Sequence, residues 1–126
     1  MSEILIDHVL LDRVTKAAKE SPRLRMNYNF HESLSSPSQR LLNALEPGTV
    51  LPIHRHRHTA ETYVLLRGRM RVLFYDDDKK EINRYELDPA EGTYGINIPR
   101  GQWHTIEVLC AGTCLLYTSP SPRDTR

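Results

Sequence analysis

The feature that most constrains the fold is a series of short extended segments that follows Pro22 and is interrupted by turn-forming residues. The segments span residues 24–31, 40–45, 50–56, 61–67, 70–75, 81–87, 93–98 and 103–109. Short strands at this spacing are typical of an all-β sandwich or barrel. Arg67-Gly68 and the run Asp76-Asp77-Asp78 supply turn signals on either side of a hairpin. The sequence therefore predicts an all-β domain.

A single helix is predicted before these strands, over residues 6–21. Its apolar residues recur at helical spacing and Pro22 follows as a stop: Ile6, Val9, Leu10, Val14, Ala17 and Ala18. His8 is expected to be an ordinary surface residue of this helix. We expect three parts in the chain, namely the helix in 1–21, the β domain in 22–113 and a separate tail in 114–126.

Length and charge exclude several classes of protein. A chain of 126 residues fits one domain with a single core. Seventeen basic and sixteen acidic residues leave no global field that would attract nucleic acid or a membrane surface. Residues 1–13 lack the pattern of a signal peptide, and no apolar run approaches the roughly 20 residues of a membrane span. We therefore expect a cytoplasmic protein with neither nucleic acid nor membrane as a partner.

The most informative stretch for chemistry is 48–68, GTVLPIHRHRHTAETYVLLRG. His54 and His56 are two residues apart, so in an extended chain both side chains point the same way and can reach one ion. Glu61 follows five residues later and adds a carboxylate. Imidazole and carboxylate ligands together suit zinc, iron, nickel, copper or manganese. A further ligand is needed, and His104, after a Pro/Gly turn, is the best candidate.

If these four residues face inward, alternation along the strands places Tyr63, Leu65, Ile106 and Val108 inside as well. The result would be an apolar cavity with a metal near its wall. A different interpretation of HRHRH is a solvated basic strand or a phosphate-contacting patch. Glu61 and the 99–104 segment favour the metal site, with His58 left as a loop or pocket-rim residue.

These residues resemble the cupin family. The motif G-x5-H-x-H-x4-E-x6-G is matched at each fixed position, through Gly48, His54, His56, Glu61 and Gly68. The core of the second cupin motif, P-x-G-x-x-H, is matched by residues 99–104. The resemblance implies a double-stranded β-helix, or jelly roll, with a short N-terminal α-helix here.

Two positions depart from the second motif. Thr93 stands where a glycine is usual, and Val108 stands where an asparagine is usual. Neither position is a metal ligand in cupins, so the departures concern strand ends more than the site.

More narrowly, the NYNFH, RLLNALEPGT and HRHRH runs resemble the WbuC-type cupin metalloproteins. That resemblance implies one divalent ion (Fe, Zn, Ni or Mn) and a small-molecule ligand such as a sugar or sugar-nucleotide of bacterial surface-polysaccharide metabolism. Two alternatives stay open: an iron-dependent dioxygenase of a small substrate, and a non-catalytic ligand-binding or sensing domain. Whether the protein is an enzyme is therefore left open, and by analogy with cupins we expect a homodimer.

A substrate-facing role is predicted for the strand at 25–31. Its odd positions are polar, namely Arg25, Asn27, Asn29 and His31, and its even positions are apolar. An outer strand with its polar face in water would show the same alternation. Two amides, an arginine and an imidazole nevertheless suit sugar hydroxyls or a carboxylate. His58 and Tyr63 complete the residues expected to contact a substrate.

The end of the chain, after Thr113, is a tail rich in Ser, Pro and Arg in which we expect no core pattern. From Cys114 to Asp124 the sequence CLLYTSPSPRD resembles one reading frame of a sequencing adapter, which implies a non-biological tail and a missing true C-terminus. A disordered natural tail would also be rich in Ser and Pro. In either case Leu115, Leu116 and Tyr117 are β-prone enough to take the place of a last strand.

Overall fold

The computed structural model describes residues 3–30 and 38–120. Its elements are α1 (His8–Glu20), β1 (Arg25–Asn29), β2 (Ser38–Leu45), β3 (Glu61–Arg67), β4 (Met70–Tyr75), β5 (Glu81–Leu87), η1 (Pro89–Glu91), β6 (Gly95–Ile98), β7 (Trp103–Val108) and β8 (Thr113–Pro120). The strands form a five-stranded sheet of order β1-β2-β8-β3-β6 and a three-stranded sheet of order β5-β4-β7. All the pairings are antiparallel. The predicted all-β fold with a short N-terminal helix is confirmed.

The two sheets enclose the main core. Each strand from β2 to β8 contributes to it, through Leu45, Tyr63, Leu65, Met70, Val72, Leu87, Ile98, Val108 and Leu115. The predicted inward alternation is confirmed for Tyr63, Leu65 and Val108, which are buried, and Ile106 packs against the same cluster. Burial of this apolar surface is the main stabilising contribution. It also leaves the inner faces of β3 and β7 as the walls of the site.

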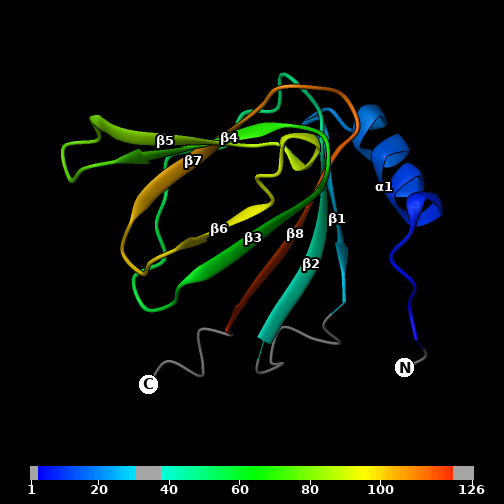
Figure 1. Cartoon of the computed structure of the whole chain (residues 1–126), viewed down its shortest axis with the longest axis horizontal. Coiled ribbons are helices and arrows are strands. Elements are labelled where there is room, and N and C mark those ends of the chain that lie inside the picture. Colours follow the sequence, from blue (N-terminus) through cyan, green and yellow to red (C-terminus); the bar gives the residue numbers. More distant parts are fainter. Residues whose placement is uncertain (1–2, 31–37, 121–126) are drawn as a thin grey trace.

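Helix α1 covers the opposite face of the five-stranded sheet, where it lies along β1 and β2 (Figure 1). The helix begins after Asp7, whose carboxylate accepts a hydrogen bond from the Leu10 N–H, as expected of an N-cap. Leu10, Leu11, Val14 and Ala18 pack on Leu42 and Ala44 of β2. Ile6 and Val9 were expected in this apolar stripe but are exposed. Ile6 precedes the helix, which begins at His8, and Val9 lies on the outer side of the helix.

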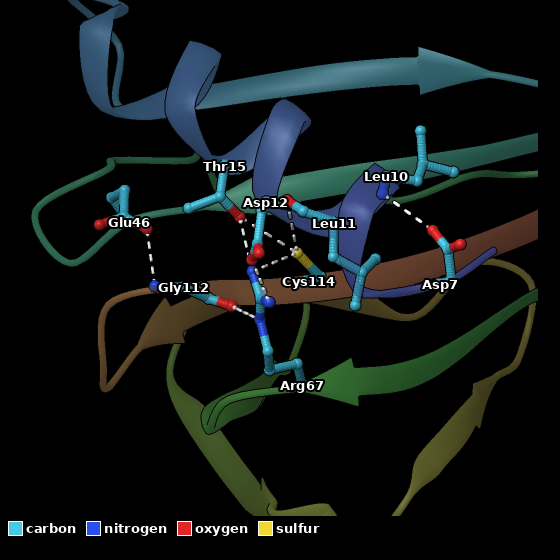
Figure 2. A network of polar contacts seen from close by, with 9 residues as sticks. All are labelled: Asp7, Leu10, Leu11, Asp12, Thr15, Glu46, Arg67, Gly112 and Cys114. Atoms are coloured by element: carbon cyan, nitrogen blue, oxygen red, sulfur yellow. Dashed lines mark hydrogen bonds and ion pairs between the residues drawn. The ribbon is translucent and has the colours of Figure 1, made fainter.

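A polar network joins α1 to the ends of β3 and β8 (Figure 2). The Arg67 guanidinium donates hydrogen bonds to Asp12 Oδ1 (2.7 Å), Thr15 Oγ1 (3.0 Å) and the Gly112 carbonyl (2.8 Å). Glu46 accepts a hydrogen bond from the Gly112 N–H at 2.8 Å. These contacts hold the helix against the sheet, away from the cavity.

Residues 50–56 were predicted as a strand, and this prediction is wrong. Only His54 forms a β-bridge, to His104, and the residues around it are loop. Pro52 lacks the N–H that a ladder needs, so a regular strand cannot run through it. The two glycines at the ends of the motif 48–68 both have positive φ, +96° at Gly48 and +97° at Gly68. At Gly68 an added Cβ would also overlap Thr113, which accounts for glycine in the motif.

The segment after Thr113 was expected to lack a core pattern, and the structure differs. β8 pairs with β2 on one side and β3 on the other, in the middle of the five-stranded sheet. Cys114 and Leu115 are buried on its two faces. The β-prone run Leu115 to Tyr117 therefore fills the strand position suggested for it.

In residues 3–30 and 38–120 no helix is long and apolar enough to cross a membrane.

Candidate metal centre

Backbone pairing brings the two predicted ligand segments together. The His54 N–H donates to the His104 carbonyl (3.0 Å) and the His104 N–H donates to the His54 carbonyl (2.9 Å). β3 provides Glu61 at its first residue, on the same inner side. As a result His54, Glu61 and His104 each offer one ligand atom, and these atoms lie within 4.8 Å of one another.

Both bridged histidines are oriented by backbone carbonyls. His54 Nδ1 lies 3.0 Å from the Pro52 carbonyl, and His104 Nδ1 lies 2.8 Å from the Gln102 carbonyl. A carbonyl only accepts hydrogen bonds, so each Nδ1 carries the proton and each Nε2 keeps its lone pair. Metal-binding histidines commonly donate their other ring N–H to a carbonyl or carboxylate in this way, which leaves Nε2 for the metal.

The contact between Glu61 and His104 is the unusual feature. Glu61 is 3% exposed and His104 0% exposed. Glu61 Oε1 lies 3.2 Å from His104 Nε2 without hydrogen-bond geometry, and it has no other hydrogen-bond partner in the described part of the chain. With the proton on Nδ1, these two atoms are both electron-pair acceptors. The Tyr63 hydroxyl, 3.3 Å away, can donate a hydrogen bond to His104 Nε2, but Glu61 Oε1 has no donor. A cation between the two atoms, either a proton or a metal ion, would satisfy both.

The donor set fits a divalent metal. Ligand atoms about 2.0–2.2 Å from one ion lie roughly 2.8–3.6 Å apart at right-angle or tetrahedral ligand angles. The 3.2 Å separation of Glu61 Oε1 and His104 Nε2 is within that range. Two imidazoles and a carboxylate suit Zn, Fe, Ni or Mn.

His56 lies beside this cluster and not within it. Its Nε2 is 3.3 Å from Glu61 Oε2, the other carboxylate oxygen. Its ring is 5.5 Å from that of His54 and 6.4 Å from that of His104, measured between centroids. This half-buried side chain would have to rotate to join the other three as a ligand.

The local electrostatics keep the carboxylate charged. Burial acts to raise the pKa of Glu61, but hydrogen bonds from the His104 and His56 rings, when these carry a proton toward the carboxylate, outweigh it and hold the pKa at about 2. Burial lowers the pKa of His54, which favours its neutral, ligating form. The Glu61 carboxylate raises the pKa of His56. Burial also raises the pKa of Tyr63, so its hydroxyl, 3.3 Å from His104 Nε2, stays protonated.

A cavity of about 310 Å³ opens beside this cluster. Its lining includes His54, His56, Glu61 and Tyr63, together with Arg25 and Asn27 from β1. Other residues of the predicted substrate set lie elsewhere. Asn29 and His58 are exposed and outside the lining, and His31 falls outside the described residues.

Three polar residues of the lining were missed by the sequence analysis. Gln39 and Asn43 lie on β2, on the same face of the strand as Leu41 and Leu45, and all four residues line the cavity. Alternation along the predicted strand 40–45 would have found Asn43. Tyr117 comes from β8, and the expectation of a tail without core pattern hid it.

Sequence comparison finds one matching family. Residues 6–87 match DUF6016, a domain of unknown function, and this match covers well over half of the chain. The chain belongs to the DUF6016 family. The matched range includes His54, His56 and Glu61, whereas His104 lies beyond it. A search among curated proteins finds no significant match.

Solved structures similar to this member of DUF6016 have the cupin fold. The cupin domain of Cnp3 from Schizosaccharomyces pombe is 13% identical, with a TM-score of 0.62 over 79% of this chain and 66% of that one. CapF, a capsular polysaccharide assembling protein of Staphylococcus aureus, is 21% identical, with a TM-score of 0.61 over 75% of this chain and 26% of that one.

Oxalate decarboxylase of Bacillus subtilis, a protein with Mn(II) centres, is 20% identical. Its TM-score is 0.58 over 77% of this chain and 25% of that one. This chain thus spans less than two thirds of the length of each of these three proteins. At such identities the similarity shows the fold, which is the cupin jelly roll.

Proposed function

We propose that this protein binds one divalent metal ion through His54, Glu61 and His104, joined by His56, and uses it to hold a small polar ligand in the cavity. The observation that carries the proposal is the pair of buried acceptors, Glu61 Oε1 and His104 Nε2, 3.2 Å apart. A bound metal would supply a Lewis acid at the cavity wall.

The side chains of the cavity support a ligand with several hydroxyls and an anionic group. Asn27, Gln39 and Asn43 supply amide donors and acceptors, and Arg25 is a cation at the same wall. The Arg25 guanidinium is steadied by a hydrogen bond of 3.1 Å to the Val50 carbonyl. Apolar residues, among them Leu41, Leu45 and Ile106, line the rest of the cavity and help to exclude water, as in most small-molecule sites.

A sugar or sugar-nucleotide meets this description best. The resemblance to WbuC-type cupins supports a role in bacterial surface-polysaccharide metabolism, and the fold of the capsular polysaccharide assembling protein CapF is in keeping with it. The homodimer and the cytoplasmic location stay predictions, the first of which size-exclusion chromatography tests.

The ligand class is tested by a thermal-shift screen of metal-loaded protein against nucleotide sugars, free sugars and small carboxylic acids. A nucleotide sugar should raise the melting temperature. Asn27→Ala should weaken that ligand's binding by roughly threefold to tenfold, the effect of one hydrogen bond. Metal content should not change.

Asn29→Ala is the matched control, because Asn29 lies on the same strand but outside the cavity lining. Equal effects of the two substitutions would contradict the proposed ligand site. Iron content with oxygen uptake would instead favour a dioxygenase of a small substrate. Zinc or nickel without redox activity is the result that the proposal expects.

A further inference from the structure

The loop that carries His54 and His56 is held to residues at the start of β7 by four hydrogen bonds, three of which join backbone groups. Two are the reciprocal bonds between His54 and His104. In the others the Gly101 N–H donates to the His56 carbonyl at 2.7 Å, and the Thr105 hydroxyl donates to the Leu51 carbonyl at 2.9 Å. These bonds fix the path of the loop, but they do not by themselves fix how it is rotated about that path.

Arg55, between the two histidines, points to the opposite side. It is absent from the cavity lining that contains both its neighbours. Its guanidinium carbon lies 4.5 Å from the centroid of the Trp103 ring, and its side chain is only 24% exposed. This is a cation–π contact in which the flat guanidinium covers an indole.

The turn of the β4–β5 hairpin, which projects from one end of the fold, completes the contact (Figure 1). Asp77 Oδ1 lies 3.7 Å from Arg55 Nη1. Lys79 Nζ lies 4.9 Å from the centroid of the Trp103 ring. Trp103 thus meets two cations, while Asp77 provides a negative charge beside Arg55.

We propose that Arg55 is a positioning residue for the metal site. Trp103 immediately precedes His104, and Arg55 lies between His54 and His56, so their contact joins the two ligand-bearing segments on the outer side. The hydrogen bonds fix the path of the loop, and the Arg55–Trp103 contact prevents its rotation about that path. Both histidine side chains therefore keep their orientation toward Glu61. The inference rests on the proposed metal binding and adds a residue to it.

The test compares Zn²⁺ affinities of metal-stripped Arg55→Ala and Arg57→Ala by competition with a chelator. Arg57 is the matched control, because it has the same charge in the same loop but is exposed. Arg55→Ala should weaken Zn²⁺ binding about tenfold, the lower end of the loss seen when a group that orients a metal ligand is removed. Arg57→Ala should stay within about twofold of the wild type, since its side chain is exposed and orients no ligand.

Arg55→Lys provides a rescue and Trp103 provides a direct readout. Lysine keeps the cation but not the planar group, so it should recover part of the affinity. Trp103 is the one tryptophan in the sequence, and its fluorescence should change on Zn²⁺ binding in the wild type and less in Arg55→Ala.

Equal Zn²⁺ affinities for Arg55→Ala and Arg57→Ala, with the wild type binding Zn²⁺, would overturn the positioning role and leave the metal site intact. The positioning role would also be overturned if the loss of Zn²⁺ affinity in Arg55→Ala merely followed a fall in its melting temperature and Arg55→Lys recovered none of the affinity. A wild type that binds no Zn²⁺ or other divalent ion would overturn the proposed function and this inference together.

Discussion

Two buried carboxylates have opposite surroundings. Glu46 is 6% exposed and accepts a hydrogen bond of 2.8 Å from the Gly112 N–H, in the network drawn in Figure 2. Glu61 is 3% exposed, and its Oε1 lies 3.2 Å from His104 Nε2 and accepts no hydrogen bond from the described residues. A buried polar group without a partner costs about 1–3 kcal/mol. We infer that the first carboxylate is satisfied by the fold and that the second needs a cation.

The largest difference between the two carboxylates should appear in metal affinity when each is neutralised in turn. Glu61→Gln removes a charged ligand and should lower metal affinity by more than about 100-fold, which exceeds the effect of removing a group that only orients a ligand. Glu46→Gln keeps an oxygen that can accept from Gly112 and should leave metal affinity near the wild-type value. Isothermal titration of metal-stripped protein measures both. A similar loss in the two variants would mean that Glu61 is an ordinary structural acid.

Replacement of single histidines should separate the metal ligands from their exposed neighbour. His56→Ala or His104→Ala should remove most of the bound metal, because each takes away an imidazole beside Glu61. His58→Ala should leave much of it, since His58 is exposed. Elemental analysis of the purified variants provides the measurement. Equal loss in His58→Ala with none in His54→Ala would move the ligand pair to His56 and His58.

Metal affinity should depend on pH with a defined sign. Protons compete with metal for neutral imidazole, so affinity falls as pH drops toward and below the histidine value of about 6.5. His56 should take up a proton first, because the Glu61 carboxylate raises its pKa, and His54 later, because burial lowers its pKa.

Glu61, with a pKa of about 2, stays ionised in this range. We expect at least a tenfold loss of affinity between about pH 7.5 and 5.5, since each protonated ligand costs a factor of ten per unit. Chelator competition at a series of pH values measures it. A flat profile would exclude histidine ligation.

The smallest effect is expected on the helix side of the sheet. Arg67→Ala removes the hydrogen bonds to Asp12, Thr15 and Gly112, two of them to partly exposed groups. We expect a loss of about 1–2 kcal/mol in the free energy of unfolding. Metal affinity should not change. Urea denaturation of the metal-stripped protein checks the first expectation, and a change in metal content would show that the two faces are coupled.

The sequence pattern was sufficient to predict strand boundaries where apolar and polar residues alternate regularly. The strands 61–67, 70–75 and 81–87 were predicted to the residue, because alternation and turn residues agree there. It failed at 50–56, where Pro52 and bonds to β7 override an extended pattern. The contrast between Asn27 and Asn29 was also beyond the sequence. Both fall on the polar face, but strand alternation does not reveal how far the cavity extends along β1.

The last strand was the least predictable part of the fold. Cys114 lies on the helix side and Leu115 in the main core, although nothing in their local pattern indicates a central strand. That residues 114–124 resemble a translated adapter stays a prediction. Resequencing of the source locus tests it, and an open reading frame that keeps this segment in independent clones would refute it.

The central claim is that the pair Glu61 and His104 is bridged by a metal ion and not by a proton. Elemental analysis of the purified wild type tests it most directly. We expect close to one transition-metal or zinc ion per chain, reduced to trace levels in Glu61→Gln and retained in Glu46→Gln. A wild type that is free of metal as purified, and that takes up no Zn, Mn, Fe or Ni on titration, would contradict it.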